Sequence, residues 1–300
     1  MTYSIIARDP QTGHLGVAVQ TCNLAVGAWV PWAEAGVGAV ATQAVAERRY
    51  GALGLELMRG NLAAPEALAA LLAADARRDF RQVSMIDCQG RVATHTGARC
   101  LPEAGSIAGD GFCVQANMMA RDTVWQAMAH RYRDAEGDLA QRLLAALEAA
   151  EGQGGDIRGK QAAALLVVGH PPARFPLVDL RVDHHPHPVA ELRRMLTLHR
   201  AYMAEYDVRE WVERGQPQRA YELVQQIGRW APGEPYLQFL RALHLAGRLD
   251  RWDEGLALMR KLVEADPMWE EYLRRDAAVD HFDCGGASER LLQQLQEGNA

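Results

Sequence analysis

The chain has 300 residues, of which 49% are hydrophobic and 23% are charged, and this length and composition suit two globular domains with apolar cores. The formal net charge is −6 and there is no run of basic residues, so we expect no nucleic-acid partner. No segment approaches about 18 consecutive apolar residues, and Arg8, Asp9 and Pro10 interrupt the apolar N-terminus, so we expect neither a membrane helix nor a signal peptide. Five cysteines form no CxxC pair, which favours reduced thiols in a cytoplasmic protein.

The first 170 residues or so alternate between predicted strands and predicted helices. Residues 9–13 form a turn, because proline fixes φ early in it and glycine supplies the positive φ at its end, so the flanking strands make an antiparallel hairpin. The predicted strands are, in chain order, 3–8, 14–21, 28–32, 37–43, 82–87, 91–96, 112–117 and 161–168. Helical periodicity falls at 50–58, 65–72 and within 122–151. Hairpins on each side of paired helices predict an α+β fold of antiparallel sheets with segregated helices.

An amphipathic helix from Val189 to Tyr202 is predicted to connect this half to a wholly helical tail. Four positions recur in the tail 35 residues apart: Ala220 with Gly255, Leu223 with Leu258, Ile227 with Leu262 and Pro232 with Pro267. That separation is next to the 34-residue period of tetratricopeptide repeats, whose units are helix pairs. We therefore divide the chain into a domain of residues 1–200 and a repeat region of residues 205–300. Two units are few for a stacked array, so we expect the tail to pack on the first domain or on another subunit.

Thr2 is a candidate nucleophile because it follows the initiator Met directly. A small second residue permits removal of Met1, which would leave Thr2 with an α-amine whose ordinary pKa is about 7.7–8. One residue then supplies both the nucleophilic hydroxyl and the general base. The alternative is that Thr2 is only the residue before a strand, and its position alone does not decide between the two.

Several stretches occur in a fixed order that is similar to a known family. They are Thr2–Gln20, Val26–Ala44, Asp87–Val92, Thr96–Arg99, Phe112–Asn117, Gly154–Val167 and Arg181–Leu192. In these stretches the chain resembles the domain-of-unknown-function 1028 family, which is placed in the N-terminal-nucleophile (Ntn) hydrolase superfamily. The resemblance covers about residues 2–200 and does not cover the tail. It implies a four-layer αββα sandwich with Thr2 as the nucleophile at the start of the first strand.

Polar residues at the ends of two predicted strands are candidates for stabilising an oxyanion. Thr42 and Gln43 end one strand and Asn117 ends another, so their backbone N–H groups or amides could face the carbonyl under attack. For each of the three, the alternative is a polar residue that bonds nearby backbone groups at a strand end.

Four further residues are predicted to bind substrate or to support the nucleophile. Asp156 and Arg158 could orient the α-amine and bind a substrate carboxylate, since a guanidinium makes bidentate bonds to carboxylates. Their alternative role is an ion pair that stabilises a glycine-rich turn. Gln20 and Asn23 flank the end of the second strand, close to where Ntn enzymes keep residues that support the nucleophile.

Other reactive or metal-binding side chains are weaker candidates for a functional role. Cys22 is a rival nucleophile, although no histidine lies near it in the sequence. The cluster Asp183, His184, His185 and His187 is too tightly spaced to form a four-ligand site unaided, so we predict a turn or cap there and expect no metal and no cofactor. The tryptophans and tyrosines of the tail are interpreted as repeat packing, with a partner-binding groove as the second possibility.

The leading functional hypothesis is an Ntn amidohydrolase that cleaves a small amide or peptide-like bond, acting on C–N bonds other than standard peptide bonds. The alternative is a non-catalytic ligand-binding or scaffold protein that recruits a protein partner through the helical tail. A homodimer is compatible with either.

Overall fold

The predicted turn after the first strand is present in the computed structural model, which describes residues 2–171 and 175–297. The Asp9 carboxylate accepts two backbone hydrogen bonds within the turn, each of 2.9 Å, and Gly13 has a φ of +73°. The chain therefore returns as an antiparallel hairpin made of β1 (Thr2–Arg8) and β2 (Leu15–Thr21).

This hairpin lies at the centre of a six-stranded antiparallel sheet with the order β10-β9-β2-β1-β8-β7. The other four strands are β7 (Gly105–Gly109), β8 (Phe112–Asn117), β9 (Ala162–Val168) and β10 (Val178–Val182). In this register Thr2 stands opposite Thr21 on one side and opposite Asn117 on the other. Three polar residues therefore meet at one end of the sheet.

A second antiparallel sheet, with the order β3-β4-β5-β6, packs face to face on the first. Its strands are β3 (Pro31–Glu34), β4 (Gly38–Ala44), β5 (Arg81–Asp87) and β6 (Val92–Thr96). Short 3-10 turns, η1 (Val26–Ala28) and η2 (Arg78–Phe80), precede β3 and β5. Ile6, Val17 and Val19 of the first sheet share a buried core with Ala41 and Ile86 of the second. This shared core fixes the inner faces of both sheets.

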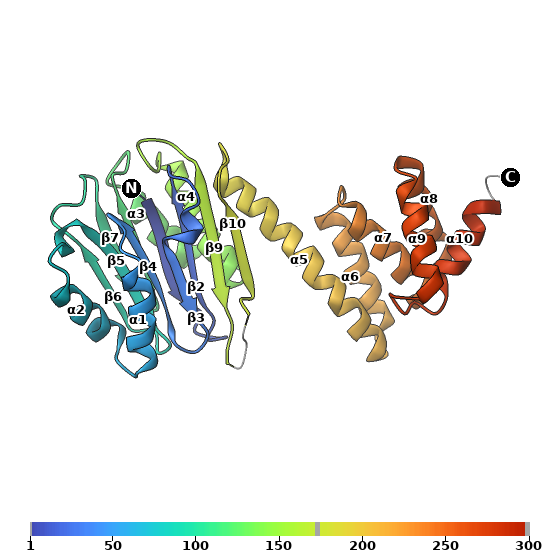
Figure 1. Ribbon diagram of the computed structural model, residues 1–300, viewed down its shortest axis with the longest axis horizontal. Coiled ribbons are helices and arrows are strands. Elements are labelled where there is room, and N and C mark those ends of the chain that lie inside the picture. The colour runs from blue at the N-terminus through green and yellow to red at the C-terminus, as the bar shows by residue number, and fades with distance from the viewer. Residues whose placement is uncertain (1, 172–174, 298–300) are drawn as a thin grey trace. The chain divides into compact units, whose positions relative to one another are not determined.

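Helices cover the outer face of each sheet (Figure 1). Those on the four-stranded sheet are α1 (Arg49–Arg59) and α2 (Ala64–Ala74), and those on the six-stranded sheet are α3 (Val124–Asp134) and α4 (Leu139–Gly152). A Cβ at Gly16 would lie 2.6 Å from the Leu143 side chain, so glycine lets α4 approach β2 closely. The layers run helix, sheet, sheet, helix, and the predicted α+β fold with antiparallel sheets is confirmed.

The chain divides into two compact units between Met195 and Leu196, within helix α5 (Pro188–Glu213). The second unit is helical in its described part. Its elements are α6 (Pro217–Trp230), α7 (Pro235–Leu243), the π-helical turn η3 (His244–Arg248), α8 (Trp252–Ala265), α9 (Met268–Val279) and α10 (Ala287–Glu297). Consecutive helices contact one another and bury a core that contains Val224, Leu240 and Leu273.

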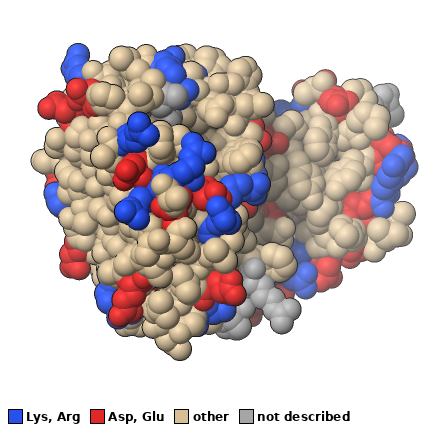
Figure 2. Space-filling model, turned by 60° about the vertical axis from the view of Figure 1, so that its left-hand side comes forward, with Lys and Arg blue, Asp and Glu red and all other residues tan. Residues whose placement is uncertain are grey.

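Positive and negative side chains are interspersed on the face of the molecule drawn in Figure 2. Many basic residues are paired with acids, as Arg59 is with Glu34 and Arg209 with Glu213. Exposed pairs of this kind contribute little to stability, about 0–1 kcal/mol each. Among the helices in the described part of the chain, none is long and apolar enough to cross a membrane.

Candidate functional site

A cavity of about 300 Å³ opens where β1 begins and where β2 and β4 end. Its polar lining consists of Thr2, Thr21, Asn23, Gln43 and Arg158, and its apolar lining includes Leu24, Val26, Trp29 and Val30. Four of the eight predicted site residues therefore share one cavity. Its size is at the lower end of the range for small-molecule pockets, about 300–1,000 Å³. We call it the Thr2 cavity.

Thr2 is held on both its side chain and its backbone. Its Oγ1 donates a hydrogen bond to Thr21 Oγ1 at 3.2 Å. Its carbonyl oxygen accepts from Gln43 Nε2 at 3.0 Å and from Asn117 Nδ2 at 3.4 Å. Thr2 is only 5% exposed. The first residue of β1 is therefore fixed in place at the edge of the cavity.

A buried network of amides between the two sheets explains how Thr2 is held. Gln82 Oε1 accepts from Gln43 Nε2 at 2.7 Å and from Asn117 Nδ2 at 2.8 Å. Both amide hydrogens of Gln43, and both of Asn117, are thus engaged by Gln82 and by the Thr2 carbonyl. Gln43 and Asn117 therefore position the Thr2 backbone. Because all their amide hydrogens are engaged, their side chains are not free to stabilise an oxyanion, the role that the sequence had suggested.

The network extends behind Gln43 through residues that the sequence analysis did not single out. Ser4 Oγ donates to Gln43 Oε1 at 2.7 Å, and Gln115 Nε2 donates to Ser4 Oγ at 3.2 Å and to the Ala41 carbonyl at 3.0 Å. Gln115 Oε1 has no partner within the described residues, but the bonds that are made still link the two sheets and make their interface rigid. The sequence pattern that could have predicted these residues is the recurrence of Ser and Gln at inward-facing positions of otherwise apolar strands.

Replacing Gln82 by Met is expected to destabilise the fold by about 2 kcal/mol, because the amides of Gln43 and Asn117 would lose their shared acceptor while staying buried. Urea unfolding measures the loss. Gln89→Met is the matched control, since Gln89 is an exposed glutamine on the turn after β5. Equal stability of the two variants would contradict a structural role for the network.

Backbone strain accompanies the network at the ends of two strands. Ala44 and Met118, which directly follow Gln43 and Asn117, have φ values of +67° and +55°. The left-handed conformation costs a non-glycine residue about 1–2 kcal/mol. Such strain persists where the surrounding structure imposes it, and it gathers at active sites and ligand clamps. Here both strained residues follow the two side chains that hold Thr2.

Two predicted residues lie away from the cavity because strand side chains alternate between faces. Thr42, next to the inward-facing Gln43, donates its hydroxyl to the Glu47 carbonyl at 3.3 Å. Gln20, next to Thr21, shares the outer face of β2 with Gly16, which meets α4. Gln20 is fully buried, and neither polar atom of its amide has a hydrogen-bond partner within the described residues.

Asp156 and Arg158 form an ion pair at the rim of the cavity, in a turn where Gly154, Gly155 and Gly159 all have positive φ. The carboxylate of Asp156 is inaccessible to solvent, and its Oδ2 accepts from Arg158 Nη2 at 2.8 Å and from the Cys22 backbone N–H at 3.1 Å. The Asp156 carboxylate raises the pKa of Arg158 above its ordinary value. Only Arg158 of the pair lines the cavity, with its side chain 32% exposed.

The rival groups are placed elsewhere. The Cys22 thiol contacts the Arg158 carbonyl at 3.5 Å and is not among the residues that line the Thr2 cavity. In the histidine cluster, His185 Nδ1 accepts from the His187 backbone N–H at 3.0 Å, as in a turn before α5. Within residues 2–171 and 175–297, no group of three or more His, Cys, Asp or Glu residues is arranged to hold a metal ion.

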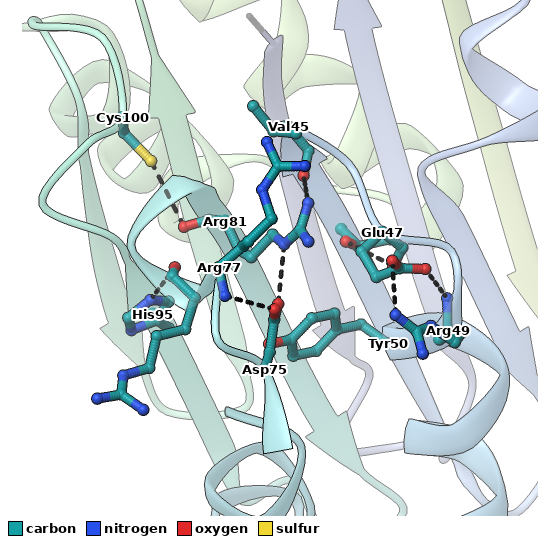
Figure 3. Close-up of polar contacts among 11 residues, drawn as sticks. Val45, Glu47, Arg49, Tyr50, Asp75, Arg77, Arg81, His95 and Cys100 are labelled. Atoms are coloured by element: carbon teal, nitrogen blue, oxygen red, sulfur yellow. Dashed lines mark hydrogen bonds and ion pairs between the residues drawn. The ribbon is translucent and has the colours of Figure 1, made fainter. Parts of the chain in front are cut away.

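One wall of the cavity, which includes Ala44 and Ala46 at and after the end of β4, is anchored by a largely buried ion pair (Figure 3). Arg81 Nε binds Asp75 Oδ2 at 2.8 Å, and the side chains are 6% and 14% exposed. Arg81 Nη1 also donates to the Val45 carbonyl at 2.7 Å. The bond from Arg81 lowers the pKa of Asp75 to about 2. The pair ties the segment after β4 to the start of β5.

The layered sheets and the polar cavity at the first residue of a central strand define an α+β protein with a small-molecule-sized site. The chain matches the family described as "Family of unknown function (DUF1028)" over residues 2–192. The chain belongs to this family. The match ends before the helical tail.

A solved structure supports the same assignment. The chain is similar to protein SPO2555 from Silicibacter pomeroyi, which is also described as DUF1028, with 35% sequence identity and a TM-score of 0.60. The similarity covers 65% of this chain and 87% of that one. A search of the curated proteins gave no match.

Proposed function

We propose that this protein is an Ntn-type amidohydrolase in which Thr2, after removal of Met1, attacks a small amide or peptide-like bond. The observation that carries the proposal is the position of Thr2 as the first residue of a central strand, lining a cavity and held by Thr21, Gln43 and Asn117. Met1 itself lies outside the described residues.

In the proposed reaction, Thr2 Oγ1 forms a bond to the carbonyl carbon of the substrate as its proton passes to the Thr2 α-amine, directly or through a water. The C–N bond then breaks and the amine proton goes to the departing nitrogen. Water hydrolyses the resulting ester and regenerates the hydroxyl. Thr21, whose Oγ1 lies 3.2 Å from Thr2 Oγ1, orients the nucleophile in this scheme.

The oxyanion needs a donor that the inter-sheet network does not occupy. Asn23 is the cavity-lining amide outside that network, and we assign it this role. Gln43 and Asn117 then act as positioning residues through the Thr2 carbonyl. The assignment places the donor on the segment after β2, two residues beyond Thr21.

Recognition of the substrate follows from the remaining lining. Arg158 supplies a guanidinium suited to a carboxylate, while Val26, Trp29 and Val30 supply an apolar wall. We therefore favour small amides that carry an apolar group and an acidic group. Asp156 keeps Arg158 in place in this scheme.

The finer fold assignments belong to the same proposal. The helix–sheet–sheet–helix order supports the Ntn-hydrolase-like αββα sandwich, and the 35-residue recurrence supports a tetratricopeptide-like tail. All five cysteines are free thiols, which supports a reducing compartment such as the cytoplasm.

The proposal requires a processed N-terminus, and the intact mass of the purified protein tests this first. We expect the mass to lack one Met residue, and we expect the processed protein to hydrolyse members of a panel of small N-acyl amides. A protein that retains Met1 and still turns over the same amides would rule out the Thr2 mechanism. A protein that retains Met1 and is inactive would favour the non-catalytic alternative.

A further inference from the structure

The helical unit contains a second cavity, of about 330 Å³, which lies between α5, α7, η3 and the segment before α10. We call it the tail cavity. Its walls combine aromatic rings with buried polar groups, which is the usual make-up of a ligand pocket. Neither the family match nor the Thr2 cavity includes it.

Two side chains that line the tail cavity have buried polar atoms without partners. His244 is 5% exposed; its Nε2 lies 3.0 Å from Glu205 Oε1, whereas its Nδ1 has no hydrogen-bond partner among the described residues. Arg248 Nη2 donates to the Phe282 carbonyl at 2.6 Å, while its Nε is buried and unpartnered within the same described part of the chain. Buried polar atoms are nearly always satisfied, so this pair indicates that a ligand completes the site.

The backbone at these residues is unusual as well. His244 and Arg248 are the first and last residues of η3, where the Leu249 N–H bonds to the His244 carbonyl at 3.0 Å. Single π-helical turns are rare and occur frequently at functional sites. Gly247 lets the turn approach Cys284 closely, because a Cβ at that position would lie 2.4 Å from the Cys284 carbonyl oxygen. The turn therefore packs directly against the chain that carries Phe282.

The other side of the tail cavity is aromatic. The rings of Tyr202 and Tyr236 are tilted by 30° to each other with centroids 6.5 Å apart, and Phe282 also lines the space. Tyr206, 70% exposed, stands at the rim. These rings offer a flat apolar surface to one ring or one branched aliphatic group. The volume is small for an extended chain and suits a single side chain with its terminal group.

The charges favour an anion. Arg209 and Arg248 both line the tail cavity, but two carboxylates outside it already pair with Arg209, so Arg248 is the guanidinium available to an anion. The guanidinium of Arg248 cannot lose its proton, so its unpartnered Nε calls for an acceptor. His244 Nε2 lies 3.0 Å from Glu205 Oε1, and its Nδ1 can donate to a second acceptor when it carries a proton. A carboxylate supplies both acceptor atoms.

We propose that the tail cavity binds a small carboxylate that carries an aromatic or branched aliphatic group, either as a free acid or as the C-terminal residue of a peptide. Arg248 and His244 hold the carboxylate, and Tyr202, Tyr236 and Phe282 hold the side chain. This site is independent of the proposed hydrolase activity.

The test is calorimetric titration of the full-length protein with matched pairs of probes. The pairs are N-acetylphenylalanine and its amide, and a pentapeptide ending in phenylalanine with a free or an amidated C-terminus. We expect at least one free acid to bind about tenfold or more tightly than its amide, since only the acid can accept charge-assisted bonds from Arg248. The acid that binds more tightly identifies the source, a metabolite or a protein end.

Variants separate recognition from folding. Arg248→Gln is expected to reduce the affinity of the acid to that of the amide, and Tyr206→Ala, at the exposed rim, to weaken both probes without affecting the fold. Arg260→Gln, an exposed arginine of α8 outside the tail cavity, serves as the control and should bind like the wild type. Equal affinity for acid and amide, no binding of either acid, or unchanged acid binding by Arg248→Gln in a folded protein would overturn the proposal.

Discussion

Replacing Thr2 with Ala is expected to lower amide turnover by about 10⁴-fold or more, the scale on which removal of a catalytic nucleophile acts. Alanine leaves the α-amine and the backbone carbonyl in place, so the hydrogen bonds from Gln43 and Asn117 persist. The variant loses only the hydroxyl and its 3.2 Å contact with Thr21. Steady-state kinetics with the best amide of the panel measures the effect, and urea unfolding checks that stability changes little.

Two companion variants make the result specific. Thr2→Ser keeps a hydroxyl in the same position and is therefore expected to retain turnover. If the two variants differ in turnover in this way while both stay folded, the hydroxyl of residue 2 is needed for the reaction and not only for the fold. Thr12→Ala removes a hydroxyl in the turn at the far end of the same hairpin and is expected to match the wild type. If Thr2→Ala turns over amides at the wild-type rate, the nucleophile lies elsewhere, and thiol alkylation of the wild type would then test Cys22.

The fold was predicted best where local chemistry determines the backbone. The turn at residues 9–13 and the strands around it follow from Pro10 and Gly13, and they are confirmed. The strand β7 is not among the predicted strands, because its glycines disfavour a strand by their conformational freedom. Its glycines serve tertiary packing instead: a Cβ at Gly105 would lie 2.7 Å from the Trp125 ring. No local pattern contains that contact.

The candidate site was predicted only in part, for a related reason. Thr2, Asn23, Gln43 and Arg158 were selected from strand ends and family motifs, and strand ends of adjacent strands do meet in space. The network that holds Thr2 joins residues far apart in the chain, such as Gln43 with Gln82 and Ser4 with Gln115, which are separated by 39 and 111 positions. A single sequence carries no signal for such pairs. The tail cavity likewise depends on a π-helical turn that interrupts the helical periodicity.

The second large effect is expected at the ion pair that anchors one wall of the Thr2 cavity (Figure 3). Asp75→Asn should destabilise the protein by about 3 kcal/mol at pH 7, because it leaves the guanidinium of Arg81 buried without its carboxylate. The side chain of Arg81 is 6% exposed, so solvent screens the lost charge poorly. Asp79→Asn, an exposed aspartate of η2, is the matched control and should change the free energy of unfolding by less than about 0.5 kcal/mol.

The difference between wild type and Asp75→Asn should also depend on pH, with a sign that follows from the pKa of Asp75. Its folded pKa of about 2 lies below the unfolded value of about 3.9, so the stabilisation is complete above pH 4–5 and is lost as pH falls toward 2. The pH-dependent stabilisation from the lowered pKa of Asp75 amounts to about 2 kcal/mol, and about half of it should be lost at pH 3. Urea unfolding of both proteins at pH 7 and pH 3 measures the difference in their free energies of unfolding. If that difference is the same at both pH values, Arg81 does not stabilise the ionised form of Asp75. Arg81 also binds the Val45 carbonyl, so the same substitution should loosen the cavity wall formed by Ala44 and Ala46. A loss of amide turnover that accompanies the loss of stability would link this ion pair to the Thr2 cavity.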